Sequence, residues 1–183
     1  MKVICYGDSN TYGFDPRSLF GSRYSAEHRW TDILADKTGW TISNQGTNGQ
    51  EIPRNYLMFS GDMDLLIVML GTNDLLQGRS SNEIALRMER FLESISVPNL
   101  LLISPPPLQV GAWVSDNTLI ENSVMLSKNY KVLAEQHHVL YVDAGKWDID
   151  LAFDGVHFSE KGHRAFAEGL YGYLIHAGFI GQG

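Results

Sequence analysis

A serine, an aspartate and a histidine in this sequence have the types and the spacing that acyl transfer requires. Ser9 follows a short apolar run near the start of the chain, and Asp154 precedes His157 by three residues near the end. A serine hydroxyl is a poor nucleophile at neutral pH unless a neighbouring base removes its proton, and histidine has the pKa best suited to that task. A carboxylate one turn before the imidazole can bind Nδ1–H and leave Nε2 facing the serine. The three residues therefore predict nucleophilic catalysis by Ser9.

Acyl transfer also requires hydrogen-bond donors for the negative charge that develops on the carbonyl oxygen, and each such donor is worth about 2.7–4 kcal/mol in mutational terms. Three donors fit this role: the backbone N–H of Ser9, the backbone N–H of Gly49 and the side-chain amide of Asn73. A glycine lets the backbone approach a substrate closely because it has no Cβ. An amide at position 73 attracts an oxyanion, whereas a carboxylate there would repel it.

The elements that must position these residues alternate along the chain. Short apolar runs rich in β-branched residues predict strands, and stretches of helical period between them predict helices, which is typical of βαβ units and a parallel sheet. We expect strands near 2–6, 40–44, 64–70, 99–104 and 139–143, and helices near 26–37, 80–95, 117–137 and 159–177, with a short one after Ile52. Residues 65–70 and 100–103 are continuously apolar, which indicates strands covered on both faces.

This pattern predicts one α/β domain over residues 1–183: a three-layer α/β/α sandwich with a five-stranded, parallel, doubly wound, flavodoxin-like sheet. Such sheets bind ligands beyond the carboxyl ends of their strands, where Ser9, Gly49 and Asn73 all fall. Two long loops rich in glycine and proline, 13–25 and 105–116, are expected to wall a pocket there. Aromatic residues near these ends, as candidates for that wall, are Tyr12, Trp113, Trp147 and Phe158.

Four blocks of the sequence, in this order and spacing, resemble the SGNH (GDSL-type) hydrolases: Gly-Asp-Ser-Asn at 7–10, Asn-Gln-Gly-Thr-Asn-Gly at 44–49, Gly-Thr-Asn-Asp at 71–74 and Asp-Gly-Val-His at 154–157. The resemblance implies that Ser9 is the nucleophile, that His157 and Asp154 complete the triad, and that Gly49 and Asn73 join Ser9 in the oxyanion hole. Gly46 is the alternative to Gly49. We prefer Gly49 because the donor glycine of the family lies five positions after the asparagine of its block. The first block has Asn10 where the eponymous form has leucine.

The chain looks most like the bacterial arylesterases and acyltransferases of that family, notably in its proline run at 105–107. This resemblance implies a serine esterase that hydrolyses short-chain acyl esters through an acyl-serine intermediate, with alcohols as further acyl acceptors. A carbohydrate acetylesterase would use the same residues and differ only in its pocket. A non-catalytic, flavodoxin-like binding module is a third alternative, which the lack of a glycine-rich phosphate loop disfavours.

Composition and charge bound the remaining questions. The net charge is −7, and Lys and Arg form no block, so we expect neither nucleic acid nor an anionic membrane as partner. The ligand that the family resemblance implies is a small-molecule ester. Asp8 and Asp74 are interpreted as loop braces, and His28, His137, His138, His163 and His176 as helix residues. No histidine, cysteine and carboxylate set has the spacing of metal ligands, so we expect no metal and no cofactor. The lone Cys5 is typical of a reducing, cytoplasmic setting. The sequence does not decide between a monomer and a homo-oligomer.

Overall fold

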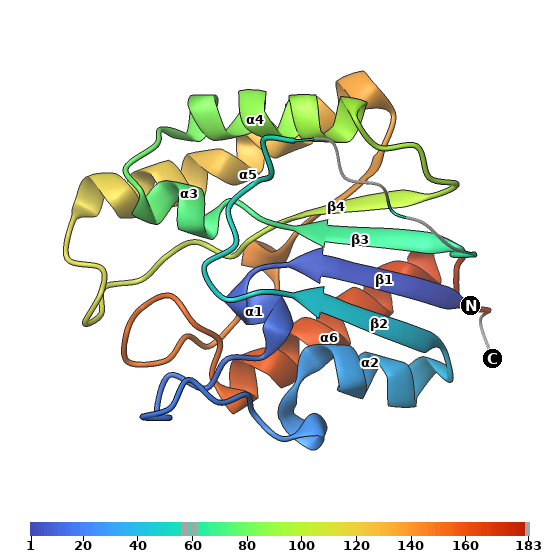
Figure 1. Ribbon diagram of the computed structural model, residues 1–183, viewed down its shortest axis with the longest axis horizontal. Helices are drawn as coiled ribbons and strands as arrows, with labels where there is room; N and C mark the ends of the chain where they lie inside the picture. Colours follow the sequence, from blue (N-terminus) through green and yellow to red (C-terminus); the bar gives the residue numbers. More distant parts are fainter. Residues whose placement is uncertain (56–58, 60–61, 182–183) are drawn as a thin grey trace.

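The computed structural model describes residues 1–55, 59 and 62–181. Within these residues, five parallel strands form one sheet in the order β2-β1-β3-β4-β5, which Figure 1 shows. The strands are β1 (Lys2–Gly7), β2 (Thr41–Gly46), β3 (Leu65–Met69), β4 (Leu100–Ser104) and β5 (Leu140–Asp143). The doubly wound, flavodoxin-like sheet predicted from the sequence is confirmed. Its strand order reverses between β1 and β3, and ligands bind at such a switch point.

Helices cover both faces of the sheet and complete the three predicted layers (Figure 1). On one face lie α2 (Trp30–Thr38) and α6 (Glu160–His176), whose apolar side chains pack over Cys5 and its neighbours. Cys5 is fully buried, as its place in an apolar run predicts, and burial raises the pKa of its thiol. On the other face lie α4 (Ser81–Glu93) and α5 (Asn117–His137). Every residue of β3 is buried, because this central strand is covered on both sides.

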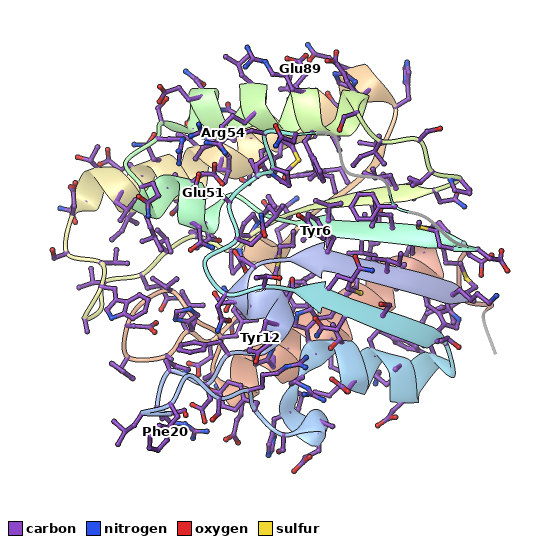
Figure 2. The ribbon with its side chains drawn as sticks, viewed as in Figure 1. Tyr6, Tyr12, Phe20, Glu51, Arg54 and Glu89 are labelled. Atoms are coloured by element: carbon purple, nitrogen blue, oxygen red, sulfur yellow. The ribbon has the colours of Figure 1, made fainter. Side chains whose placement is uncertain are left out.

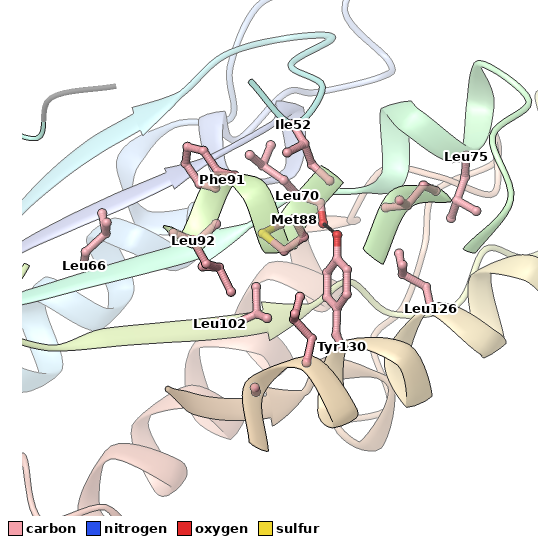
Figure 3. Packing of buried hydrophobic residues seen from close by; sticks show 14 of the residues in the cluster. Ile52, Leu66, Leu70, Leu75, Met88, Phe91, Leu92, Leu102, Leu126 and Tyr130 are labelled. Atoms are coloured by element: carbon pink, nitrogen blue, oxygen red, sulfur yellow. Dashed lines mark hydrogen bonds between the residues drawn. The ribbon is translucent and has the colours of Figure 1, made fainter. Parts of the chain in front are cut away.

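Tyr130 of α5 joins the second layer to the end of β3. Its ring lies among the apolar side chains of that layer, and its hydroxyl donates to the carbonyl oxygen of Leu70 at 3.1 Å (Figure 3). Gly71 follows at once with a φ of 125°, and a Cβ there would lie 2.9 Å from both Tyr130 and Leu126. Only glycine can make this turn, which starts the short helix α3 (Thr72–Leu76) at the sheet edge.

The structure corrects several expected boundaries. Two short helices, α1 (Ser9–Tyr12) and α3, lack the length at which a hydrophobic period is recognisable. The helix expected over 26–37 divides into the 3₁₀ turns of η1 (Ala26–His28) and α2, because Arg29 between them is extended. A second 3₁₀ turn, η2 (Ala144–Lys146), follows β5. The short helix expected after Ile52 falls in a stretch of which residues 56–58 and 60–61 lie outside the described part.

Candidate active site

Ser9, His157 and Asp154 form a continuous line of hydrogen bonds at the carboxyl end of the sheet. The Ser9 Oγ lies 3.0 Å from the Nε2 of His157, and the Nδ1 of His157 lies 2.7 Å from the Oδ2 of Asp154. All three side chains are buried. The fold thus brings together two segments that are 148 residues apart in the sequence. This arrangement can transfer a proton from the hydroxyl to the imidazole and stabilise the resulting imidazolium.

The carboxylate of Asp154 is held by the turn that it begins. Its Oδ1 accepts hydrogen bonds from the backbone N–H groups of Val156 and His157, each at 2.9 Å. Burial acts to raise the pKa of Asp154, but the hydrogen bonds from His157 and from these backbone groups outweigh it, and the pKa is lowered. Asp154 therefore stays ionised and keeps its remaining oxygen directed at the imidazole.

Ser9 is the first residue of α1, and its neighbour Asp8 caps this helix. The Asp8 carboxylate accepts the N–H of Asn10 at 2.9 Å, so the bracing function expected of Asp8 corresponds to a helix cap. Burial raises the pKa of Asp8 to about 6, against the opposing effects of its hydrogen bonds and of His157. Because Asp8 is the cap, the hydroxyl of Ser9 is left to face His157.

Asn10 is a site residue that sequence reasoning missed. Its side-chain amide donates to the carbonyl oxygen of Val156 at 3.2 Å and accepts the N–H of Phe158 at 2.8 Å. These two partners are the neighbours of His157 on either side, so a single amide holds the histidine segment against the serine segment. The sequence signal that could have indicated this function is the asparagine at position 10, where the eponymous form of the family has leucine. Only the fold shows what the amide contacts.

The proline-rich loop at 105–116 braces the other side of the histidine segment. The N–H groups of Gln109, Ala112 and Trp113 donate to the carbonyl oxygens of Gly155, Phe153 and Asp154 at 3.0, 2.9 and 3.1 Å. The loop that we expect to wall a pocket thus also fixes the backbone around Asp154. It places the indole of Trp113 edge-on to the His157 ring, with 5.2 Å between the ring centroids.

A cavity of about 200 Å³ opens beside the Ser9 hydroxyl. Phe14 and Trp113 form aromatic walls on either side of His157, and the Phe14 ring centroid lies 4.7 Å from that of the imidazole. Phe14 was not anticipated, although the loop 13–25 to which it belongs was expected to wall a pocket. The complete lining is Ser9, Phe14, Asn48, Gly49, Asn73, Leu76, Trp113 and His157.

The expected oxyanion donors Gly49 and Asn73 both line this cavity, whereas Gly46 does not. The N–H of Gly46 donates to the Asn44 side chain at 2.9 Å, and a Cβ on Gly46 would lie 2.1 Å from the Tyr12 nitrogen. Gly46 is thus packed beneath α1. Gly49 has a positive φ of 72° and open space where a Cβ would be. The geometry favours Gly49 over Gly46 as a backbone donor.

The amide of Asn73 is oriented by the loop that carries Gly49. Its Nδ2 donates to the carbonyl oxygen of Gln50 at 3.1 Å. A primary amide has two N–H groups, and this bond uses one of them. Two segments that follow different strands thus line the same cavity, and this hydrogen bond joins them.

The model of the GDSL-like lipase/acylhydrolase family matches residues 5–165 of the sequence. The chain belongs to this family. It is therefore a hydrolase of carboxylic esters, and the SGNH (GDSL-type) resemblance noted in the sequence is confirmed. No curated protein matches the sequence.

Solved structures agree with this assignment. The M. smegmatis aryl esterase shares 25% of its residues with the chain, at a TM-score of 0.82 over 96% of this chain and 98% of that one. A carbohydrate acetylesterase from Sinorhizobium meliloti shares 26%, also at a TM-score of 0.82, over 96% and 99% of the two chains.

In this GDSL-family esterase, three of the four aromatic residues expected at the pocket wall lie elsewhere, and only Trp113 lines the cavity. The ring of Tyr12 carries the Arg23 guanidinium 4.5 Å above its centroid (Tyr12 is labelled in Figure 2). Trp147 packs edge-on against Phe166 of α6. Phe158 is fully buried in the same layer, where its ring packs against that of Phe166.

Asp74 is buried as a loop brace, and His163 is buried between aromatic rings in α6. One group of possible metal ligands exists among the described residues, away from the cavity: atoms of Glu89, Glu93 and His137 lie within 4.8 Å of one another. These side chains are half-buried or exposed at the surface of α4 and α5, and His137 contacts Glu89 at 3.4 Å. None of the helices in the described ranges has the length and apolar character needed to cross a bilayer.

Proposed function

We propose that the protein is a serine esterase that hydrolyses short-chain acyl esters through an acyl-serine intermediate. The observation that supports this most directly is the hydrogen-bonded line of Ser9, His157 and Asp154 beside a cavity of about 200 Å³. A nucleophile, its base and the residue that orients the base are all within hydrogen-bonding distance of one another. Among the described residues that line the cavity, no other group offers a comparable arrangement.

In the first half of the reaction, the Ser9 Oγ attacks the ester carbonyl carbon while His157 Nε2 takes the hydroxyl proton. The carbonyl π electrons move to its oxygen, and the oxyanion accepts hydrogen bonds from the N–H groups of Ser9 and Gly49 and from the Asn73 amide. The imidazolium, stabilised by Asp154, then gives its proton to the leaving alkoxide, and the ester C–O bond breaks. An acyl-serine and a free alcohol result.

In the second half, water takes the place of the alcohol. His157 removes a proton from the water as its oxygen attacks the acyl carbon, and the same donors bind the second oxyanion. Collapse of this intermediate returns the proton to Ser9 and releases the carboxylic acid. An alcohol that enters instead of water would receive the acyl group as a new ester.

The size of the cavity and the nature of its walls support a short acyl group. A volume of about 200 Å³ holds about eight heavy atoms beside Ser9, since a cavity of about 150 Å³ accommodates benzene, and Phe14, Leu76 and Trp113 make its walls largely apolar. An acetyl or propionyl group fits this description better than a long chain.

The carbohydrate acetylesterase is the second candidate, and the exposure of Trp113 favours it. This side chain is 57% exposed although it lines the cavity, so part of its indole face is available outside. Aromatic faces supply large apolar contact surfaces for the alcohol part of a substrate, including a sugar ring. A panel of acetylated sugars beside p-nitrophenyl esters of increasing acyl length separates the two candidates by kcat/KM.

The serine mechanism is tested with a fluorophosphonate probe and p-nitrophenyl acetate. Wild type should form an adduct on Ser9, and Ser9→Ala should form none and lose turnover by several orders of magnitude. Ser127→Ala is a matched control, because it removes an exposed hydroxyl on α5, remote from the cavity. Turnover by Ser9→Ala at the wild-type rate would refute the mechanism, and a tightly retained nucleotide without ester turnover would favour a binding module.

A further inference from the structure

Behind the cavity lies a group of four charged side chains that the reaction itself does not use. We call Glu51, Asp74, Arg79 and Arg87 the charge cluster. Arg79 contacts Glu51 at 3.0 Å and Asp74 at 3.8 Å, and Arg87 contacts the same two carboxylates at 3.4 and 3.2 Å. Figure 2 shows Glu51 beside α3 and α4. The cluster joins three segments: the loop after β2, the helix α3 and the helix α4.

Arg87 makes the contacts that hold these segments together. From α4, its Nη2 donates to the backbone carbonyl oxygen of Ile52 at 2.6 Å, and its Nε lies 3.2 Å from the Oδ1 of Asp74. The Arg87 side chain is 17% exposed and that of Asp74 is fully buried. A planar guanidinium can bind a carbonyl and a carboxylate at once in directions set by its fixed geometry, whereas the donors of a lysine ammonium rotate and fix no such directions.

The partners of Arg87 lie close in the sequence to residues that we assign to the oxyanion hole. Asp74 directly follows Asn73, and its Oδ2 accepts the N–H of Ile52 at 3.0 Å. Ile52 lies three residues after Gly49 in the loop that follows β2, and the Gln50 carbonyl oxygen of this loop accepts a hydrogen bond from the amide of Asn73. The described hydrogen bonds between the Gly49 loop and α3 therefore all involve residues that Arg87 contacts or residues one or two positions away from them in the sequence.

The buried carboxylate gives Arg87 an electrostatic function as well. Burial raises the pKa of Asp74, while the N–H of Ile52 and the charge of Arg87 oppose this rise. A buried carboxylate with no cation beside it is costly, and the surrounding structure shifts to hydrate or neutralise it. Removal of Arg87 would leave Arg79, 3.8 Å from Asp74, as the nearest cation in the cluster and would take away the closer contact at 3.2 Å. We therefore expect Asp74, and with it the adjacent Asn73, to shift.

We propose that Arg87 is a positioning residue for the oxyanion hole, which holds the Gly49 loop and the Asn73 helix at the separation that the tetrahedral intermediate requires. Arg87 is not among the residues that line the cavity beside Ser9, so it would act through other residues. The inference rests on the proposed function, since it concerns donors used only when a carbonyl oxygen becomes negative.

The test compares Arg87→Ala, Arg87→Lys and Arg90→Ala with wild type on p-nitrophenyl acetate. Arg90 is the matched control, because it belongs to the same helix, borders the same surface cavity of about 410 Å³ and makes no ion pair with any described residue. Rates are expressed per Ser9 labelled by the fluorophosphonate, so that misfolded protein does not contribute. A boronic acid inhibitor, whose adduct with Ser9 is tetrahedral, reports on the oxyanion hole separately.

For Arg87→Ala we expect kcat to fall by about 10- to 100-fold while KM changes by less than about twofold, because the donors act in the transition state. The inhibition constant of the boronic acid should rise by a similar factor. Arg87→Lys should give intermediate values, and Arg90→Ala should match wild type. A merely structural function would lower the melting temperature without this separation of kcat from KM.

Several results would overturn the inference: a wild-type kcat in Arg87→Ala, a change confined to KM, or a lower kcat with unchanged boronic acid affinity. Should Arg87→Ala fail to fold, Arg87→Lys decides alone, and a wild-type kcat in that variant overturns the inference. Ser9→Ala is measured in parallel. If Ser9→Ala retains turnover, the proposed function fails; if it is inactive while Arg87→Ala is fully active, only the inference about Arg87 fails.

Discussion

Replacement of Asn10 by leucine should destabilise the protein and separate His157 from Ser9. The leucine side chain has the same number of heavy atoms and the same branching as that of asparagine, but it has no polar atom. It would leave the carbonyl oxygen of Val156 and the N–H of Phe158 without their present partner. Asn10 is 4% exposed, so water has little access to take over these bonds.

The magnitude follows from the two groups that lose their partner. A buried backbone group left unsatisfied costs about 1–3 kcal/mol, so Asn10→Leu should lower the free energy of unfolding by about 2–6 kcal/mol. The affected groups flank His157, and a displacement of about 1 Å in a catalytic group can lower the rate about 100-fold. We therefore expect a lower kcat in the fraction that remains folded.

The assay is guanidinium-induced unfolding, combined with p-nitrophenyl acetate turnover per fluorophosphonate-reactive serine. Asn122→Leu is the control, because the Asn122 amide also accepts one backbone N–H, from Ser81, and donates to one carbonyl oxygen, that of Thr118. That amide is partly exposed on α5, so water can replace its bonds and the loss should stay below about 1 kcal/mol. Equal losses of stability in both variants, with kcat unchanged in Asn10→Leu, would refute the reasoning.

Two further predictions concern burial and the cavity wall. Burial lowers the pKa of His163 to about 3, so below the ordinary value of 6.5 the unfolded chain binds a proton that the folded protein does not, and stability falls as the pH drops from 6.5 toward 3. His163→Phe should remove this loss. The free energy of unfolding of the variant minus that of wild type, measured by chemical unfolding, should therefore rise by about 2 kcal/mol from pH 8 to pH 5. A difference that does not change with pH would contradict the prediction. Trp113→Ala should raise kcat/KM for hexanoate relative to acetate esters by widening the cavity, with stability unchanged within about 0.5 kcal/mol because the indole is largely exposed. An unaltered chain-length profile would exclude Trp113 from the acyl wall.

The parts of the site that could be predicted from the sequence depend on short-range relations. The three-residue spacing of Asp154 and His157 already places both on one turn, and the hydrogen bonds of that turn are local. The glycine and asparagine blocks follow apolar runs directly, and parallel strands end at a common edge. The strand order then follows from right-handed crossovers and few alternatives.

The aromatic residues show where this reasoning ends. Tyr12 and Trp147 follow strand ends closely in the sequence, whereas Trp113 and Phe158 lie in longer loops, yet only Trp113 lines the cavity. An aromatic ring packs equally well against a helix, a guanidinium or a substrate, so proximity to a strand end does not decide its direction. Phe14 reaches the cavity because its loop returns from α1 toward His157.

By itself, the sequence determined the α/β architecture through its periodicity, and the family and the three residues of the hydrogen-bonded line through four short blocks that resemble a known family. Of these residues, only Asp154 and His157 lie within one turn of each other. The tertiary structure alone decided the partners of Asn10 and of Arg87. Asn10 contacts Val156 across 146 residues of sequence, and Arg87 contacts Ile52 across 35. Such contacts arise only after the layers have packed, when a buried polar group must bind whichever partner the fold brings within reach.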